Sequence, residues 1–209
     1  MNNVTIFRHP LIQHKVALLR NKNTDTKLFR ELINEITMLM AYEALNDIPT
    51  RPEQVETPLE VCTQQVIKED ILAIVPVLRA GLGMVGGILS LFPHAKVGHI
   101  GVYRDHETLE PQQYYCKLPE HMDEKLALIV DPMLATGGSA NAAIKIIKDT
   151  GCKHIKLMNI ICAPEGIEAV TGANPDVQIY CACEDRCLNE HGYILPGLGD
   201  AGDRIFGTK

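Results

Sequence analysis

Residues 127–143, with the sequence ALIVDPMLATGGSANAA, constrain the fold more than any other part of the chain. The stretch opens with four apolar residues, 127–130, which is the length of a buried strand, and Asp131 follows at the carboxyl end of that run. A short turn with two glycines comes next, and apolar residues then recur at helical spacing at Ala140, Ala143, Ile144 and Ile147. The stretch therefore predicts a strand, a tight loop and a helix.

The predicted loop has the chemistry of a phosphate site. It leaves backbone N–H groups without partners at the positive end of a helix, and Thr136 and Ser139 add hydroxyl donors. Asp131 can accept hydrogen bonds from vicinal ribose hydroxyls. The loop lacks the Lys of GxxxxGK[ST] and the order GxGxxG of dinucleotide folds. We therefore expect a ribose 5-phosphate here, and the alternative is a connection whose glycines only relieve backbone strain.

Composition limits the class of protein. A chain of 209 residues, 46% of them apolar, is long enough for one domain with a well-buried core. No apolar stretch approaches the length of a membrane span, and Arg8 and His9 stand where a signal peptide needs an apolar core, so we expect a cytoplasmic protein without membrane contact. The net charge of −6 argues against a nonspecific nucleic-acid surface, so we expect no nucleic-acid partner.

The seven cysteines are expected to be free thiols, because their number is odd and several fall inside predicted core strands. Cys181, Cys183 and Cys187 form the pattern CxCxxxC, which invites a zinc interpretation. No fourth ligand lies at the customary zinc spacing, so we expect no metal held by protein ligands alone.

Strand patterns alternate with helical patterns along the chain. A long amphipathic helix is predicted over 28–44, and the Pro-, Thr- and Glu-rich residues 47–60 indicate an irregular or edge-strand connection. Further strands are predicted over 71–77, 97–103, 155–162 and 177–182, with helices before Phe92 and from about Pro164. This succession predicts an α/β fold with a mostly parallel central sheet flanked by helices, and ligands at the carboxyl ends of the strands. The polar segment 104–119 is predicted to be a projecting β-hairpin.

The stretch VDPMLATGGS, residues 130–139, resembles the loop that binds 5-phospho-α-D-ribose 1-diphosphate (PRPP) in the type I phosphoribosyltransferases. The form is typical of the uracil phosphoribosyltransferase family. Three further motifs extend the resemblance over essentially the whole chain: VPVLRAGLGM (75–84), VYRDHETLEP (102–111) and GYILPGLGDAGDRIFGTK (192–209). Other members of the superfamily usually carry two adjacent acids where this chain has Asp131 and Pro132, so this loop offers one ribose ligand and points to the uracil branch.

The resemblance implies a glycosyltransferase of pyrimidine salvage that converts uracil and PRPP to UMP and diphosphate. It implies a single phosphoribosyltransferase domain over 1–209, a flap at 104–119 that covers PRPP, and a C-terminal uracil-binding hood at 192–209. Mg²⁺ is expected as a cofactor held mainly through PRPP. Family members commonly form dimers or larger oligomers and some respond to GTP, so a homo-oligomer, dimer or tetramer, and a GTP effector are further expectations.

The site residues follow from the same resemblance. It assigns PRPP to Arg79, Arg104, Asp131, Pro132, Met133, Leu134, Ala135, Thr136, Gly137, Gly138, Ser139 and Asp200. It places uracil against Ile194, Gly199, Asp200 and Ala201. Asp200 could also help to remove the uracil N1 proton, and no catalytic base is assigned. Arg79 and Arg104 directly follow apolar strands and would contact the departing diphosphate, whereas a solvated surface arginine is the alternative.

Two other functions stay open at this point. One is a phosphoribosyltransferase for another base. The other is an RNA-binding regulator on the same fold, which is disfavoured by the acidic chain and the lack of an evident arginine-rich surface with interleaved aromatic residues.

Overall fold

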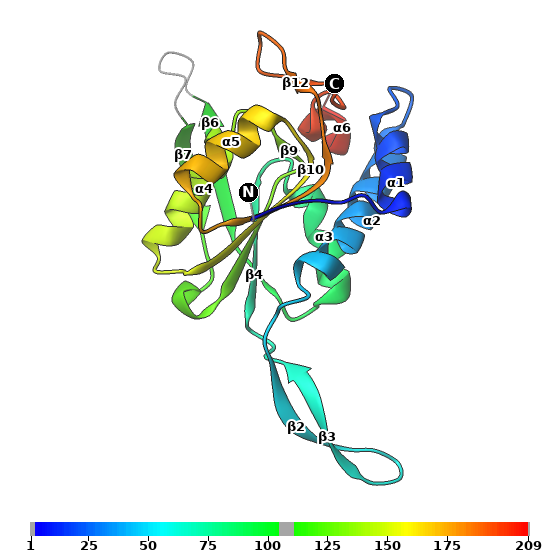
Figure 1. The fold of residues 1–209 in the computed structure, drawn as a ribbon, viewed down its shortest axis with the longest axis vertical. Coiled ribbons are helices and arrows are strands. Elements are labelled where there is room, and N and C mark those ends of the chain that lie inside the picture. Colours follow the sequence, from blue (N-terminus) through cyan, green and yellow to red (C-terminus); the bar gives the residue numbers. More distant parts are fainter. Residues whose placement is uncertain (1–2, 105–110, 209) are drawn as a thin grey trace.

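The computed structural model describes residues 3–104 and 111–208. A nine-stranded sheet forms the centre of this part of the chain, in the order β1-β11-β10-β8-β4-β6-β7, with β5 beside β4 and β9 beside β10 (Figure 1). Its strands are β1 (Val4–Ile6), β4 (Leu72–Leu78), β5 (Lys96–Val97), β6 (His99–Arg104), β7 (Pro111–Lys117), β8 (Leu126–Val130), β9 (Met133–Leu134), β10 (His154–Cys162) and β11 (Gln178–Glu184). All pairings are parallel except the antiparallel pair β6–β7.

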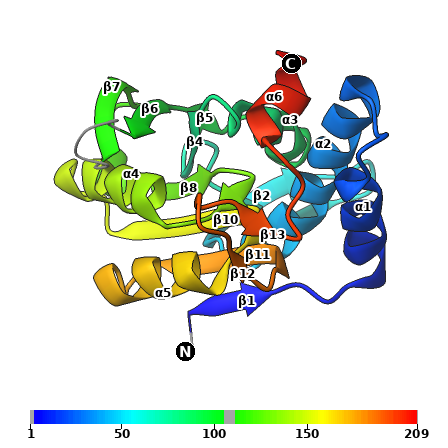
Figure 2. The same cartoon turned by 90° about the horizontal axis from the view of Figure 1, so that it is seen from above.

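Helices cover both faces of the sheet, as the view from above shows (Figure 2). One face is covered by α1 (Pro10–Arg20), α2 (Thr26–Ala44), α3 (Leu82–Leu91) and α6 (Ala201–Phe206), and the other by α4 (Gly138–Asp149) and α5 (Pro164–Ala173). A short 3₁₀ turn, Met122–Glu124, precedes β8. The predicted α/β class, with a mostly parallel sheet between helices, is confirmed. No helix in the described ranges is both long and apolar enough to cross a membrane.

The central strands carry side chains into both layers of the core. Leu128 and Val130 of β8 pack in the cluster under α2 and α3, whereas Ala127 and Ile129 pack under α4 and α5. A strand buried on both faces is apolar at every position rather than at alternate ones, which explains the unbroken run LALIV. The parallel register then places the carboxyl ends of β4, β8 and β10 at one edge of the sheet, where α3, α4 and α5 begin.

Of the two alternatives predicted for residues 47–60, the edge strand is the one formed, as the first strand of a two-stranded hairpin. β2 (Thr50–Glu56) pairs antiparallel with β3 (Val61–Ile67) along its whole length, and this hairpin, residues 50–67, extends away from the sheet as an arm (Figure 1). The arm is exposed on both faces, so its sequence has no clear alternation of buried and exposed positions. Pro52 fits because a two-stranded hairpin leaves N–H positions facing outward.

Two further predictions are refined. The strand predicted over 97–103 is interrupted at Gly98 and becomes β5 and β6. The predicted hairpin at 104–119 is confirmed at its base, where β6 pairs with β7, and residues 105–110 at its tip lie outside the described residues. After β11 the chain forms a small hairpin from β12 (Cys187–Leu188) and β13 (Ile194–Leu195), and it then enters α6.

Candidate functional site

The loop over residues 131–139 joins β8 to α4 and presents a row of backbone donors. Within the described ranges, the N–H groups of residues 135–139 donate to no protein acceptor. The side chains of Thr136 and Ser139 are exposed beside them. Gly137 precedes the helix with φ of 81°, in the left-handed region that favours glycine. Open donors at a helix N-terminus suit a phosphate group.

Helix α5 holds this loop from behind. The Ala163 N–H donates to the Leu134 carbonyl oxygen at 2.9 Å. A Cβ atom added to Gly166 would lie 2.3 Å from the carbonyl oxygen of Ala135, so only glycine lets the first turn of α5 approach this closely. The loop is therefore fixed between two helices before any ligand binds.

Asp131 lies at the end of β8, where the sequence predicts the ribose ligand. Burial raises the pKa of its carboxyl group to about 7, and a hydrogen bond from the Met133 N–H, at 3.3 Å, offsets this rise only in part. The Asn159 side-chain amide donates to the Asp131 carbonyl oxygen at 2.7 Å and fixes the strand end. A ligand that donates hydrogen bonds to this carboxylate would favour its charged form.

The loop after β4 lies directly against the end of β8. A Cβ atom on Gly81 would be 2.4 Å from the Val130 carbonyl oxygen, which shows how closely the two strand ends approach. Arg79 follows a cis peptide bond in this loop, and its half-exposed guanidinium Nη2 lies 3.4 Å from Asp203 Oδ1. The same guanidinium lies 5.9 Å from the Phe206 ring centre. Arg79 therefore stands between the sheet edge and α6.

The C-terminal hood reaches the same edge. Asp200 caps α6, since its Oδ1 accepts a hydrogen bond from the Asp203 N–H at 2.8 Å. Within the described part of the chain, the N–H groups of residues 199–201 donate to no protein acceptor. A Cβ atom on Gly192 would lie 3.7 Å from Thr136 Cγ2, so the hood borders the 131–139 loop. The hood and the 131–139 loop therefore meet at Gly192 and Thr136.

The side chains of two predicted uracil-binding residues point into the protein. Ile194 is 4% exposed and Ala201 is 2% exposed, and both belong to the core. Only their backbone groups are available to a ligand. A hollow of about 770 Å³ lies beside the hood, with Tyr193, Gly199 and Asp200 on one side and the connection from α1 to α2 on the other.

The structure thus brings together the 131–139 loop, Arg79 and the hood residues 192–201. Arg104 ends β6, the strand next to β4, and nothing beyond its place on that strand is described. Sequence reasoning missed Arg20 and Asp185. These two residues form an ion pair with each other, and both are hydrogen-bonded to the hood. No local pattern could have revealed them, because the two residues are 165 positions apart.

The comparisons with known proteins agree with one another. The family model described as uracil phosphoribosyltransferase matches residues 6–208. A protein named uracil phosphoribosyltransferase from Thermoanaerobacter sp. (strain X514) is 60% identical over 207 residues, which is 99% of each chain. A protein of the same name from Clostridioides difficile (strain 630) is 58% identical over 209 residues, which is 100% of each chain.

Solved structures give the same picture of the fold. The AQ2163 protein from Aquifex aeolicus has a TM-score of 0.94 at 38% identity, with 99% of each chain covered. An adenine phosphoribosyl transferase from Trypanosoma brucei has a TM-score of 0.58 at 11% identity, with 96% of this chain and 89% of that chain covered. The second similarity shows a shared fold alone.

Proposed function

We propose, from the premise that the chain belongs to the uracil phosphoribosyltransferase family, that the loops at the carboxyl edge of the sheet divide two substrates between them. The enzyme is a glycosyltransferase of uracil salvage that moves the 5-phosphoribosyl group of PRPP to N1 of uracil and releases UMP and diphosphate. The 131–139 loop takes the 5-phosphate and ribose, Arg79 and Arg104 take the diphosphate, and the hood takes uracil. The chain acts as one domain over 1–209, with the flap at 104–119 over PRPP.

One observation carries this assignment: the rows of open N–H groups at 135–139 and 199–201 belong to two segments, the 131–139 loop and the hood, that meet at Gly192 and Thr136. A phosphate monoester accepts several hydrogen bonds at once, which matches the first row. Uracil accepts at O2 and O4, which matches the second. Cytosine carries an amino group in place of O4, so a fixed N–H there would face another donor and the base would be rejected.

The chemistry requires stabilisation of separating charge. Breaking the anomeric bond builds positive charge on the ribose and negative charge on the diphosphate. Asp131 in its charged form accepts from the ribose hydroxyls and places a negative charge beside the ribose. The two guanidinium groups offset the charge of the leaving group through paired hydrogen bonds.

Mg²⁺ fits this site as an ion that arrives with PRPP. The described residues contain no group of three or more candidate side-chain ligands for a metal ion. Mg²⁺ commonly keeps water and substrate phosphates as ligands, and when bound it neutralises charge on the diphosphate. We assign Asp131 to the ribose hydroxyls and assign no protein ligand to the metal.

We assign Asp200 to PRPP and consider a second role for it, acceptance of the uracil N1 proton. Its Oδ1 is engaged in the cap of α6, so Oδ2 is the oxygen that faces a ligand or water. Its neighbours in the hood take the base, so Asp200 is also placed to accept the N1 proton.

The assay that tests the proposal mixes the enzyme, PRPP and Mg²⁺ with uracil, cytosine, orotate or hypoxanthine in turn. We expect UMP from uracil and no comparable product from the other bases. A product formed with hypoxanthine alone would contradict the assignment of uracil. Tight, salt-sensitive binding to RNA with negligible UMP synthesis would instead favour a regulator. A parallel series with added GTP tests the expected effector.

The arm supports a homo-oligomer. A two-stranded hairpin is marginally stable alone in water, and this one exposes Leu59, Val61 and Ile67, with Leu59 at 95%. Contact with a second copy of the chain would cover these side chains and support the hairpin.

A further inference from the structure

We propose that Arg20 and Asp185 form a positioning pair that sets the affinity of the hood for uracil. This inference rests on the proposed assignment of uracil to residues 192–201. We assign neither residue to the base itself. Both act through Gly197, which lies between the β13 strand and the open N–H groups of residues 199–201.

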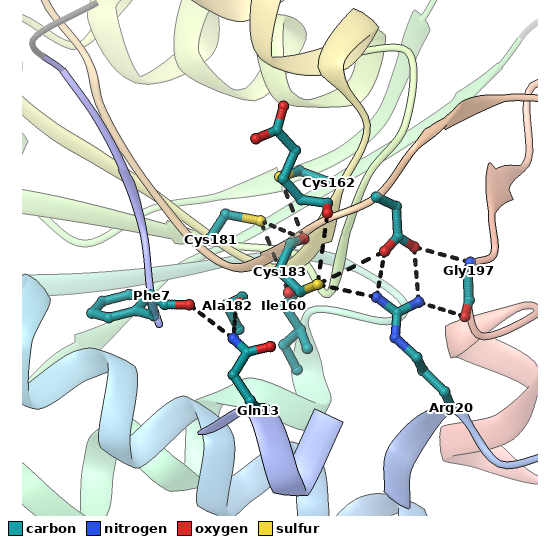
Figure 3. A network of polar contacts seen from close by, with 11 residues as sticks. Phe7, Gln13, Arg20, Ile160, Cys162, Cys181, Ala182, Cys183 and Gly197 are labelled. Atoms are coloured by element: carbon teal, nitrogen blue, oxygen red, sulfur yellow. Dashed lines mark hydrogen bonds and ion pairs between the residues drawn. The ribbon is translucent and has the colours of Figure 1, made fainter. Parts of the chain in front are cut away.

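The pair holds Gly197 by both of its backbone polar groups (Figure 3). The Arg20 guanidinium bonds both carboxylate oxygens of Asp185, with Nη1 at 2.8 Å from Oδ2 and Nη2 bonded to Oδ1. Nη1 also donates to the Gly197 carbonyl oxygen at 2.7 Å, and the Gly197 N–H donates to Asp185 Oδ2 at 2.9 Å. Carboxylate, guanidinium and turn thus form one closed network.

The network is anchored to rigid parts of the fold. Arg20 ends α1, and Asp185 follows β11 with its own N–H bonded to the Cys162 carbonyl oxygen at 2.8 Å. The Asp185 side chain is 3% exposed. Burial alone would lower the pKa of Arg20, but the hydrogen bond and the charge of Asp185 outweigh it and raise that pKa. The hood turn is therefore held by an ion pair whose carboxylate is buried.

The held turn determines where the base-facing groups point. Gly197 has φ of 65°, and a Cβ atom there would lie 2.2 Å from the Ile194 carbonyl oxygen, so the turn folds tightly on that residue. Arg204 Nη1 takes the next carbonyl, that of Leu198, at 2.8 Å. Two successive carbonyl oxygens are thus occupied by guanidinium groups, and the N–H groups that follow stay open for uracil.

The expected consequence is selective. The pair contacts the hood turn and, among the residues that the structure describes, forms no hydrogen bond or ion pair with the 131–139 loop or Arg79, so its loss should weaken uracil binding and spare PRPP. Removal of Arg20 also leaves Asp185 buried and unpaired, which destabilises the fold. A matched control must therefore lose similar stability elsewhere.

Lys156 provides that control. It lies on β10 and is 4% exposed, and it pairs with Asp47 and donates to the Ala44 carbonyl oxygen at 2.7 Å. Lys156 lies toward the amino end of the strand, away from the proposed substrates, and the side chain of its partner Asp47 is half-exposed. Lys156→Met removes a buried cation as Arg20→Met does, without touching the hood.

The experiment measures kcat, the KM for each substrate and urea unfolding in Arg20→Met, Arg20→Lys, Asp185→Asn and Lys156→Met. We expect Arg20→Met to raise the uracil KM about tenfold, which is about 1.4 kcal/mol, and to leave the PRPP KM and kcat within about twofold. The uracil KM of Arg20→Lys should lie between those of the wild-type enzyme and Arg20→Met. An ammonium group keeps the positive charge but lacks the forked donors that reach both Asp185 and Gly197. Lys156→Met should lose stability without a change in uracil KM.

Equal changes in both KM values, or a uracil KM in the Arg20 variants that matches Lys156→Met, would overturn the positioning role. If Arg20→Met does not fold, the KM values of Arg20→Lys and Asp185→Asn test the positioning role. Gly199→Ala separates the two proposals, because φ there is 83° and a side chain strains the hood directly. An unchanged uracil KM in Gly199→Ala would reject the uracil assignment and, with it, the positioning role. A raised KM there without an effect in the Arg20 variants would reject the positioning role alone.

Discussion

Asp131 joins two properties that usually exclude each other in one residue. Its carboxyl group is buried enough to have a pKa of about 7, yet the proposed chemistry needs its charged form beside the ribose. Hydrogen bonds from the ribose hydroxyls would therefore favour the deprotonated form of this carboxyl group when PRPP binds. Uracil would not make this interaction.

Asp131→Asn should weaken the use of PRPP much more than that of uracil. The amide keeps an acceptor oxygen but removes the negative charge near the developing positive centre, so we expect kcat/KM for PRPP to fall about 100-fold. Steady-state kinetics with each substrate varied checks this, with Asp149→Asn on the exposed end of α4 as the control. Equal losses for both substrates in a folded variant would count against the ribose role.

The same substitution should make the free enzyme more stable at alkaline pH. The pKa of Asp131 rises on folding from 3.8 to about 7, so the folded state binds the proton more tightly than the unfolded state. The resulting penalty is absent below pH 3.8, grows as pH rises, and is complete above about 7. We expect Asp131→Asn to gain about 1–3 kcal/mol at pH 8 and less at pH 5 in urea unfolding. A gain that does not depend on pH would show that the carboxyl group is not the cause.

Arg104→Ala should lower turnover without unfolding the protein, because we assign its guanidinium to the diphosphate. Rates at saturating and at limiting PRPP test this, and circular dichroism checks the fold. An unaltered rate in both regimes would remove Arg104 from the site.

Residues that act within a short stretch could be predicted from sequence, and residues that act across the fold could not. Asp131, Thr136 and Ser139 lie within one strand–loop–helix unit, so their proximity follows from local order alone. Their ligands stay predictions. Arg20 and Asp185 meet only because α1 packs beside the end of β11, a contact with no local signature.

At the scale of elements, the close packing of α5 behind the 131–139 loop is the feature with mechanical consequences. Gly166 faces the Ala135 carbonyl oxygen, and a Cβ atom added to Gly137 would lie 3.0 Å from the Cβ atom of Ala169 in the same helix. The loop can therefore shift only if α5 shifts with it. This rigidity keeps the donor groups in place before PRPP binds.

Gly166→Ala should raise the KM for PRPP and lower the free energy of unfolding by about 1–3 kcal/mol, because the added methyl group would sit 2.3 Å from the Ala135 carbonyl oxygen. Gly172→Ala is the matched control in the same helix, since nothing lies within 4 Å of its added methyl group. That control should be neutral or slightly stabilising. Similar kinetics for the two variants would show that α5 does not position the loop.

The elements that were predicted are those buried on both faces or on one. β4 and β8 stand out as unbroken apolar runs, and α2 has the spacing of a helix with one apolar face. For the first strand of the arm the sequence left a choice between an edge strand and a loop, and the second strand was not predicted, because the residues of the arm are mostly exposed and follow no clear pattern of a strand. Its long pairing can be recognised only from the structure.

At the scale of the molecule, the arm sets the expected assembly. Leu59→Asp combined with Val61→Asp should convert a homo-oligomer into a 23.1 kDa monomer while the sheet stays folded. Light scattering coupled to size exclusion measures the mass, with Gln64→Asp on the exposed face of β3 as the control. A wild-type chain that already runs as a monomer, or a double variant of unchanged mass, would contradict the role of the arm.

Because β4, β8 and β10 run parallel, the proposed site lies at the carboxyl ends of these strands, and their amino ends lie at the opposite edge of the sheet. Residues 150–153 form the turn before β10. The nine residues of that strand separate this turn from the loops that face the substrates. At the usual rise this is about 30 Å. An affinity tag inserted in that turn would therefore attach the enzyme to a support with its substrate site facing the solution.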